Sequence, residues 1–284
     1  MRDKPHPYNG KKAVITTKHE KGKIVGPIFE EVLGLHVSEF NIDTDVLGTF
    51  TGEIERKHSP KETVLLKARL GVSQSGASIA IASEGSIGAD PFIPFINLDF
   101  EMMAFVDNDL NLEIIESIRS TEIVSVTKTV RADEDLTEFL KRADFPNHKL
   151  IVRTKHTPVK FCIKGIDDQY SLRKAIQSVQ AEDPEKTVVI ESDLRAHCSP
   201  SRQKIIGELA TKLADRISQL CPECNTPGWG VVTHIKGVAC SECSKVSTAA
   251  LKQEVLGCSH CEFQENGRVI AQTLDPARCD WCNP

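Results

Sequence analysis

Short apolar runs and segments of helical periodicity alternate along residues 1–218. Residues 13–15 form an apolar run that predicts a strand, and a polar turn follows it. Apolar side chains then recur at helical spacing at positions 24, 28 and 32, and Gly34 is a typical helix end. Ser59 is a typical helix start, because Pro60 follows it and Glu62 stands at the spacing of a capping box.

The rest of the pattern predicts further strands and helices. We expect strands at 35–40, 78–82, 100–106, 150–152, 159–163 and 187–190, and helices at 136–140, 171–179 and from Ser199 onward. This alternation favours an α/β fold with a mixed or mainly parallel sheet flanked by helices. Helical periodicity stops near Gln219, so we predict an α/β domain with a ligand cleft over residues 1–218. A small zinc-ribbon-like, cysteine-rich module is expected over residues 219–284.

Composition and charge argue against two classes of partner. The 284 residues carry 35 Lys+Arg against 40 Asp+Glu, a net charge of −5, and only 5% are aromatic. A negative balance with few stacking side chains argues against nucleic-acid binding. No apolar stretch is long enough to span a membrane, and the polar start has no signal-peptide core. We therefore expect a cytoplasmic protein with no membrane partner.

Eight of the ten cysteines form four Cys-x-x-Cys pairs near the end of the chain: Cys221/Cys224, Cys240/Cys243, Cys258/Cys261 and Cys279/Cys282. Two such pairs complete a tetrahedral all-sulfur site, so the spacing predicts two structural zinc ions. Sequential pairing is favoured because it closes the shortest loops. A cross-braced arrangement (first with third, second with fourth) and a nested one remain open alternatives. Cys162 lies in an apolar run typical of a core, and Cys198 receives no role.

Basic side chains at two predicted helix starts are candidates for phosphate binding. Thr16, Lys18 and Lys21 lie between the first strand and a helix N-terminus, where free amides favour an anion. Arg195 and Arg202 flank the start of the helix after Ser199 and would clamp a phosphate. The structural alternatives are a solvated basic turn and an ion pair between Arg195 and a neighbouring aspartate.

Acidic side chains in three segments are candidates for catalysis and for magnesium binding. Asp45, Glu62 and Glu84 supply the carboxylates that a hard divalent ion prefers. Glu84 belongs to residues 83–86, read as a turn after a strand, where open α/β sheets place ligands. Each has a structural alternative: Asp45 as a turn former, Glu62 as a capping residue and Glu84 as part of an ordinary turn.

Several strings in the chain resemble an uncharacterised bacterial family, a domain of unknown function with a cysteine-rich C-terminal tail. The resemblance implies no activity. The segments that carry it are residues 43–45, 47–54, 82–86, 192–196 and 279–284.

The order of motifs in residues 1–90 is similar to that of the pyrophosphatases that hydrolyse inosine or xanthosine triphosphate. That family has a Ser/Thr-x-Asn-x-x-Lys turn after its first strand, and this chain has lysine in place of the asparagine. The resemblance implies phosphate binding by the basic turn and magnesium handling by the acids. The matching positions are Thr16, Lys18 and Lys21 in the turn, Glu62 with Lys67-Ala68 in the next helix, and residues 83–86 in the acidic segment.

Two functions from different classes follow from these features. The first is a divalent-metal-dependent phosphohydrolase or pyrophosphohydrolase that acts on a small nucleotide-like phosphate. The second is a non-catalytic adaptor or ligand sensor that docks a protein partner through its zinc module. Convergence of Lys21, Glu62 and Glu84 in one cleft would favour the enzyme, and their dispersal would favour the adaptor.

Overall fold

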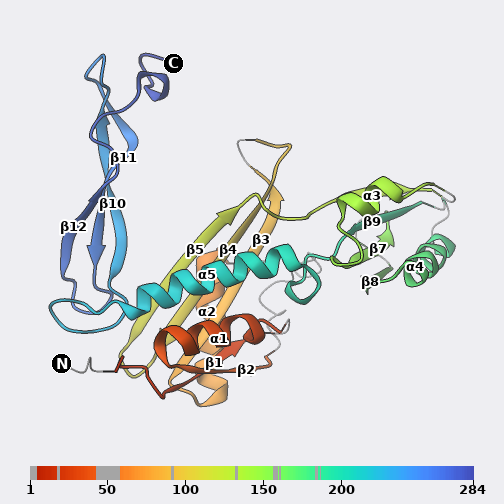
Figure 1. Cartoon of the computed structure of the whole chain (residues 1–284), viewed down its shortest axis with the longest axis horizontal. Helices are drawn as coiled ribbons and strands as arrows, with labels where there is room; N and C mark the ends of the chain where they lie inside the picture. The colour runs from red at the N-terminus through yellow and green to blue at the C-terminus, as the bar shows by residue number, and fades with distance from the viewer. Residues whose placement is uncertain are drawn as a thin grey trace.

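Three separate sheets organise the part of the chain that the structure describes (Figure 1). The structure is a computed structural model that describes residues 5–17, 20–42, 58–90, 93–131, 134–155, 159, 161–182, 185 and 187–284. No helix in these ranges has the length and apolar character needed to cross a membrane.

The first sheet is mixed and flanked by helices, as predicted. Its five strands lie in the order β2-β1-β3-β4-β5; β1 pairs in parallel with β2 and β3, and β3, β4 and β5 form an antiparallel meander. Helices α1 and α5 cover one face, and α2 covers the other. The bounds are β1 Lys12–Thr16, α1 Gly22–Leu33, β2 His36–Phe40, α2 Pro60–Ser75, β3 Ile79–Ala89, β4 Asn97–Asp107, β5 Leu112–Ser120 and α5 Pro200–Ser218.

Local signals fix the ends of these helices. The Ser59 hydroxyl accepts from the Glu62 N–H at 3.3 Å, and the Glu62 carboxylate accepts from the Ser59 N–H at 2.9 Å. The predicted capping box at the start of α2 is therefore confirmed. Gly34 follows α1 with a φ of 66°, a left-handed conformation in which glycine has no side-chain clash.

A second, smaller sheet lies beside the first and was not anticipated as a separate unit. Its four strands lie in the order β6-β9-β7-β8, and helices α3 and α4 help enclose its own hydrophobic core. The predicted strands 150–152 and 187–190 and the helix 171–179 are present, but β8 begins later than the predicted 159–163. The bounds are β6 Thr127–Val130, α3 Thr137–Arg142, β7 Leu150–Thr154, β8 Cys162–Ile166, α4 Gln169–Ala181 and β9 Val188–Ser192.

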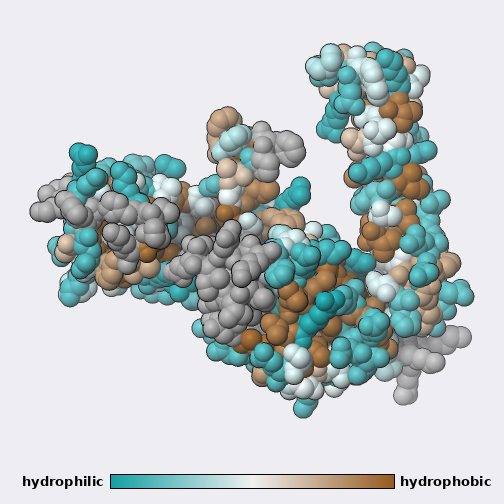
Figure 2. All heavy atoms as spheres, turned by 180° about the vertical axis from the view of Figure 1, so that it is seen from behind, coloured by the Kyte–Doolittle hydropathy of each residue, from teal (hydrophilic) through white to brown (hydrophobic). Residues whose placement is uncertain are grey.

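The cysteine-rich segment forms an arm that projects from the end of α5. Three antiparallel strands build it in the order β10-β11-β12, and the C-terminus lies at its far end (Figure 1). Seen from behind, the arm stands clear of the body, with hydrophobic side chains along its length (Figure 2). The strands are β10 Gly230–Ala239, β11 Val246–Gly257 and β12 Gln264–Val269.

Candidate functional site

A buried polar cluster lies between the first sheet and helices α1 and α5. We define the polar cluster as Lys21, Ser83, Asp99, Glu101 and Arg202, all of which are buried. β3 continues past the end of β1 toward Ala89, and Lys21, directly before α1, reaches Ser83 on this extension. β4 contributes Asp99 and Glu101 on the same face, and the first turn of α5 contributes Arg202.

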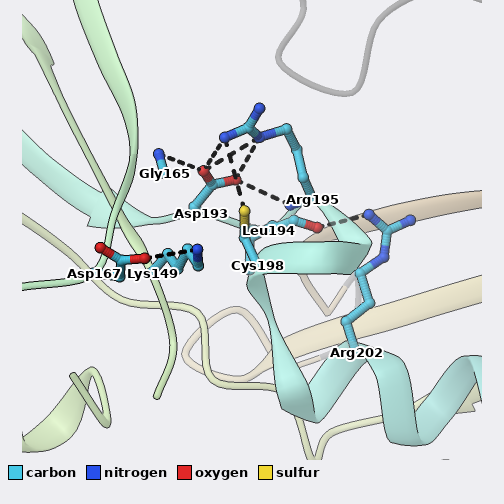
Figure 3. Close-up of polar contacts among 8 residues, drawn as sticks. All are labelled: Lys149, Gly165, Asp167, Asp193, Leu194, Arg195, Cys198 and Arg202. Atoms are coloured by element: carbon cyan, nitrogen blue, oxygen red, sulfur yellow. Dashed lines mark hydrogen bonds and ion pairs between the residues drawn. The ribbon is translucent and has the colours of Figure 1, made fainter. Parts of the chain in front are cut away.

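Two hydrogen bonds join members of the cluster, and a third connects it to Leu194. The Lys21 Nζ donates to the Ser83 Oγ at 2.7 Å. The Arg202 Nε donates to the Glu101 Oε1 at 2.6 Å. Figure 3 shows the other bond of this arginine, in which its Nη1 donates to the backbone oxygen of Leu194 at 2.6 Å. Arg202 thus joins α5 to β4 and to the segment that follows β9.

Three carboxylate oxygens of the cluster have no hydrogen-bond partner among the described residues. They are both side-chain oxygens of Asp99 and the Oε2 of Glu101, and both residues are 0% exposed. An ionised carboxylate taken out of water without a partner costs several kcal/mol, so such oxygens call for a proton or a cation.

Burial also moves two pKa values toward neutrality. Desolvation, and then the charge of Glu101, raises the pKa of Asp99 to about 7. Desolvation lowers the pKa of Lys21 to about 8, against the opposing attraction of Glu101. Groups that titrate near neutral pH in a buried site are typical of functional sites.

Gly85 leaves the room that the Glu101–Arg202 pair occupies. A Cβ at this position would overlap both the Glu101 carboxylate and the Arg202 guanidinium, whereas a Cβ at Gly88, on the same strand, would meet nothing within 4 Å. We expect Gly85→Ala to lower the free energy of unfolding by about 1–3 kcal/mol through overpacking. Thermal melts of Gly85→Ala and Gly88→Ala test this, and equal melting temperatures would show that the pair does not pack on Gly85.

Glu84 lies on the opposite face of the sheet from Ser83. Residues 83–86 lie inside β3, so the turn predicted for them is wrong. The Glu84 Oε2 accepts from the Lys67 Nζ of α2 at 2.5 Å, and both side chains are largely buried. Glu84 also acts on Lys21 through charge, since it raises the pKa of that lysine. Lys21 and Glu84 thus have different hydrogen-bond partners, Ser83 of β3 and Lys67 of α2, and neither side chain lines the pocket described below.

The other predicted residues of this region are placed differently. Glu62 is exposed, and its carboxylate is engaged by Ser59, whose hydrogen bonds hold the pKa of Glu62 below its usual value. Thr16 is buried at the end of β1, and its hydroxyl lies 3.4 Å from the Ile81 oxygen. Lys18 and Asp45 lie outside the described residues.

Arg195 forms the ion pair that was its structural alternative. Its guanidinium contacts both oxygens of Asp193, which also accepts from the Gly165 N–H at 3.0 Å (Figure 3). Burial acts to raise the pKa of Asp193, but the bonds and charge of Arg195 hold it below its usual value. Cys198 lies beside this pair, and burial raises its pKa to about 11, so its thiol stays protonated at neutral pH.

A pocket of about 510 Å³ lies between the first and second sheets. Arg195 lines it together with basic, acidic and apolar side chains of β7, β8 and β9. Two residues of the first sheet also line the pocket. Ile87 is paired with Asp99 across the ladder of β3 and β4, and Asn97 stands two positions before Asp99 on the same face of β4. The five side chains of the polar cluster do not line the pocket themselves, but Asp99 is the strand neighbour of two residues that do.

The eight paired cysteines form two groups on the arm, each with its four sulfur atoms within 4.8 Å of one another. The closest sulfur pairs in these groups are 3.6–3.8 Å apart. Four sulfurs at about 2.3 Å from a zinc ion are about 3.8 Å apart in tetrahedral geometry, so each group fits zinc. Sequential pairing is wrong and the cross-braced alternative is the one observed: Cys221, Cys224, Cys258 and Cys261 form one group, and Cys240, Cys243, Cys279 and Cys282 form the other.

Sequence reasoning did not single out Asp99 and Glu101. The available signal was two acids, two positions apart, inside the otherwise apolar predicted strand 100–106 and its approach. Acids on the buried face of a strand need a partner, so such a pair signals a buried ion pair or a ligand site.

Comparisons with known proteins give a family and a distant structural likeness. A search of curated proteins finds no match. A nucleoside-triphosphatase (dITP/XTP pyrophosphatase) from Mycobacterium abscessus is similar with 17% identity and a TM-score of 0.28, over 38% of this chain and 70% of that one. Protein VC0702 from Vibrio cholerae is similar with 15% identity and a TM-score of 0.27, over 38% of this chain and 59% of that one. Residues 67–284 match the family described as "Domain of unknown function (DUF6671)", and the chain belongs to that family.

Proposed function

We propose that the chain is a divalent-metal-dependent phosphohydrolase or pyrophosphohydrolase that acts on a small, nucleotide-like phosphate. One observation carries the proposal: two cations, Lys21 and Arg202, are buried with two carboxylates, Asp99 and Glu101, and strand neighbours of Asp99 line a pocket. Cations in a site of low polarity stabilise the charge on a phosphate more strongly than cations in water do.

Two helix N-termini support binding of an anion at this place. Lys21 caps α1, a helix of 12 residues, and Arg202 lies in the first turn of α5, a helix of 19 residues. The free backbone amides and the helix dipoles favour negative charge near these two ends. Lys21 and Arg202 would hold the phosphate, with Thr16 at the neighbouring strand end, and Glu84 would tune Lys21 from the other face of the sheet. Magnesium, when bound, would offset phosphate charge and lower the pKa of a bound water.

Release of phosphate or pyrophosphate from a panel of nucleotides, with Mg²⁺ or Mn²⁺, tests this function. We expect Lys21→Gln to lower turnover by about 100-fold, because a buried cation that stabilises the transition state is lost. Lys23→Gln is the matched control, because Lys23 is exposed and pairs with Glu20. We expect turnover to fall also in Glu84→Gln and to stay unchanged in the control. If the folded, zinc-loaded wild type releases neither phosphate nor pyrophosphate from any nucleotide of the panel, the enzyme proposal is overturned.

A non-catalytic adaptor is the second candidate function. It is favoured by the exposed apolar side chains of the arm, which include Val232, Ile235, Leu251 and Ile270. Such side chains on a projecting element suit contact with a protein partner. The same turnover panel separates the two functions, because an adaptor predicts no release from any substrate.

A further inference from the structure

We propose that Asp99 and Glu101 form a binding site for a hard divalent cation such as Mg²⁺ or Mn²⁺. The site deepens the proposed function, and its role in catalysis rests on that function, whereas cation binding itself does not depend on turnover. It differs from the acids that the sequence suggested for magnesium, because those were Asp45, Glu62 and Glu84.

The donor atoms have the chemistry that such a cation needs. Asp99 and Glu101 stand two positions apart on β4 and point to the same face, so their Cα atoms are roughly 7 Å apart. One cation can lie between side chains at this spacing. Their three unpartnered oxygens are hard ligands, which Mg²⁺, Mn²⁺ and Ca²⁺ prefer and which zinc in a sulfur site does not require.

The neighbouring cations do not satisfy these oxygens. Arg202 donates to the Oε1 of Glu101 and leaves the Oε2 without a hydrogen bond, while Lys21 directs its hydrogen bond to Ser83. No described residue donates a hydrogen bond to the Asp99 carboxylate, although this side chain is fully buried. A cation supplies the missing contacts, and a proton shared between the two carboxyl groups is the competing explanation.

The site lies next to residues that line a pocket, although Asp99 and Glu101 themselves are fully buried. Ile87, paired with Asp99, and Asn97, on the same face of β4, both line the pocket between the two sheets. A cation at Asp99 would therefore lie between this pocket and the basic side chains Lys21 and Arg202. A phosphate group in that pocket would be attracted by the cation and by the positive charges of Lys21 and Arg202 beyond it, which favours a ligand with several anionic oxygens.

Titration of the zinc-loaded full chain with Mn²⁺, followed by the EPR signal of free Mn²⁺ and with no substrate present, tests the site. We expect one Mn²⁺ to bind per chain and Asp99→Asn to weaken binding by about tenfold or more. Glu116→Gln is the matched control, because Glu116 is a largely buried carboxylate on β5 whose oxygens are already paired with Lys212 and Arg216. We expect its affinity for Mn²⁺ to equal that of the wild type.

The outcomes separate this site from the proposed function. Asp99→Asn removes a charge and no hydrogen bond, so the variant is expected to fold, and its thermal melt without Mn²⁺ verifies this. A folded wild type that binds no Mn²⁺, or a variant that binds it as tightly as the wild type, would overturn the cation site. Mn²⁺ binding that is lost in Asp99→Asn would support the site even if no nucleotide is hydrolysed, and that combination would reject only the enzyme.

Discussion

Arg202→Met should lower the free energy of unfolding by about 3–5 kcal/mol, because it leaves a buried carboxylate without its ion-pair partner. The Glu101 carboxylate is 0% exposed, and the Arg202 guanidinium donates to it at 2.6 Å. Methionine keeps much of the arginine's length and packing, so the loss reports mainly on the pairing. Chemical denaturation, followed by far-UV circular dichroism, measures the change.

The same helix offers a matched control for this prediction. Lys204, two residues further along α5, forms a salt bridge with Glu122 in which both side chains are exposed. Water screens such a pair, so Lys204→Met should give no measurable change. The double variant Glu101→Leu/Arg202→Met should be more stable than Arg202→Met alone, because it no longer buries an unpaired charge. Equal stability of Arg202→Met and Lys204→Met would contradict the buried pair.

Loss of one four-cysteine group is expected to remove one zinc ion of two and to leave the other in place. With the observed pairing, Cys221→Ser combined with Cys258→Ser damages a single group, so the variant should retain one zinc per chain. Cys221→Ser combined with Cys240→Ser damages both groups and should retain none. Structural zinc contributes directly to folding, so the arm should unfold locally where the metal is lost.

Zinc per chain, measured by inductively coupled plasma mass spectrometry on purified protein, checks the pairing. Sequential pairing predicts the reverse result, in which the Cys221/Cys240 variant keeps one zinc and the Cys221/Cys258 variant keeps none. Nested pairing predicts none in either variant. Only the cross-braced arrangement gives one zinc in the first variant and none in the second.

The fold was predictable where local signals decide it. The capping box at Ser59, the helix end at Gly34 and the apolar run of β1 are set by neighbouring residues. The division into two sheets depends on which strands pair over long separations, such as β6 with β9, and no local pattern carries that information. The residues 83–86 resemble a turn by composition, but packing keeps them in β3, where Gly85 makes room for a side-chain pair.

The site was predictable where charge stands at a helix start. Lys21 and Arg202 were found for that reason, and both are in the polar cluster. Asp99 and Glu101 were not predicted, because acids inside a strand carry no local sign of a site, and only tertiary packing shows that three of their four oxygens are buried without a hydrogen bond. Short loops favoured sequential cysteine pairing, but the hairpin of β10 and β11 carries each Cys-x-x-Cys pair away from the next one and returns the third to the first.

The route of the chain through the arm has a mechanical consequence. The chain runs along the arm three times, and each run leads from one four-cysteine group to the other. The 10 residues of β10 set the distance between the two groups at roughly 30 Å. With metal at both ends, a force applied to the C-terminal residues would be shared by all three runs of the chain and would not peel β12 from β11. The arm would then transmit force to the end of α5 as a stiff rod.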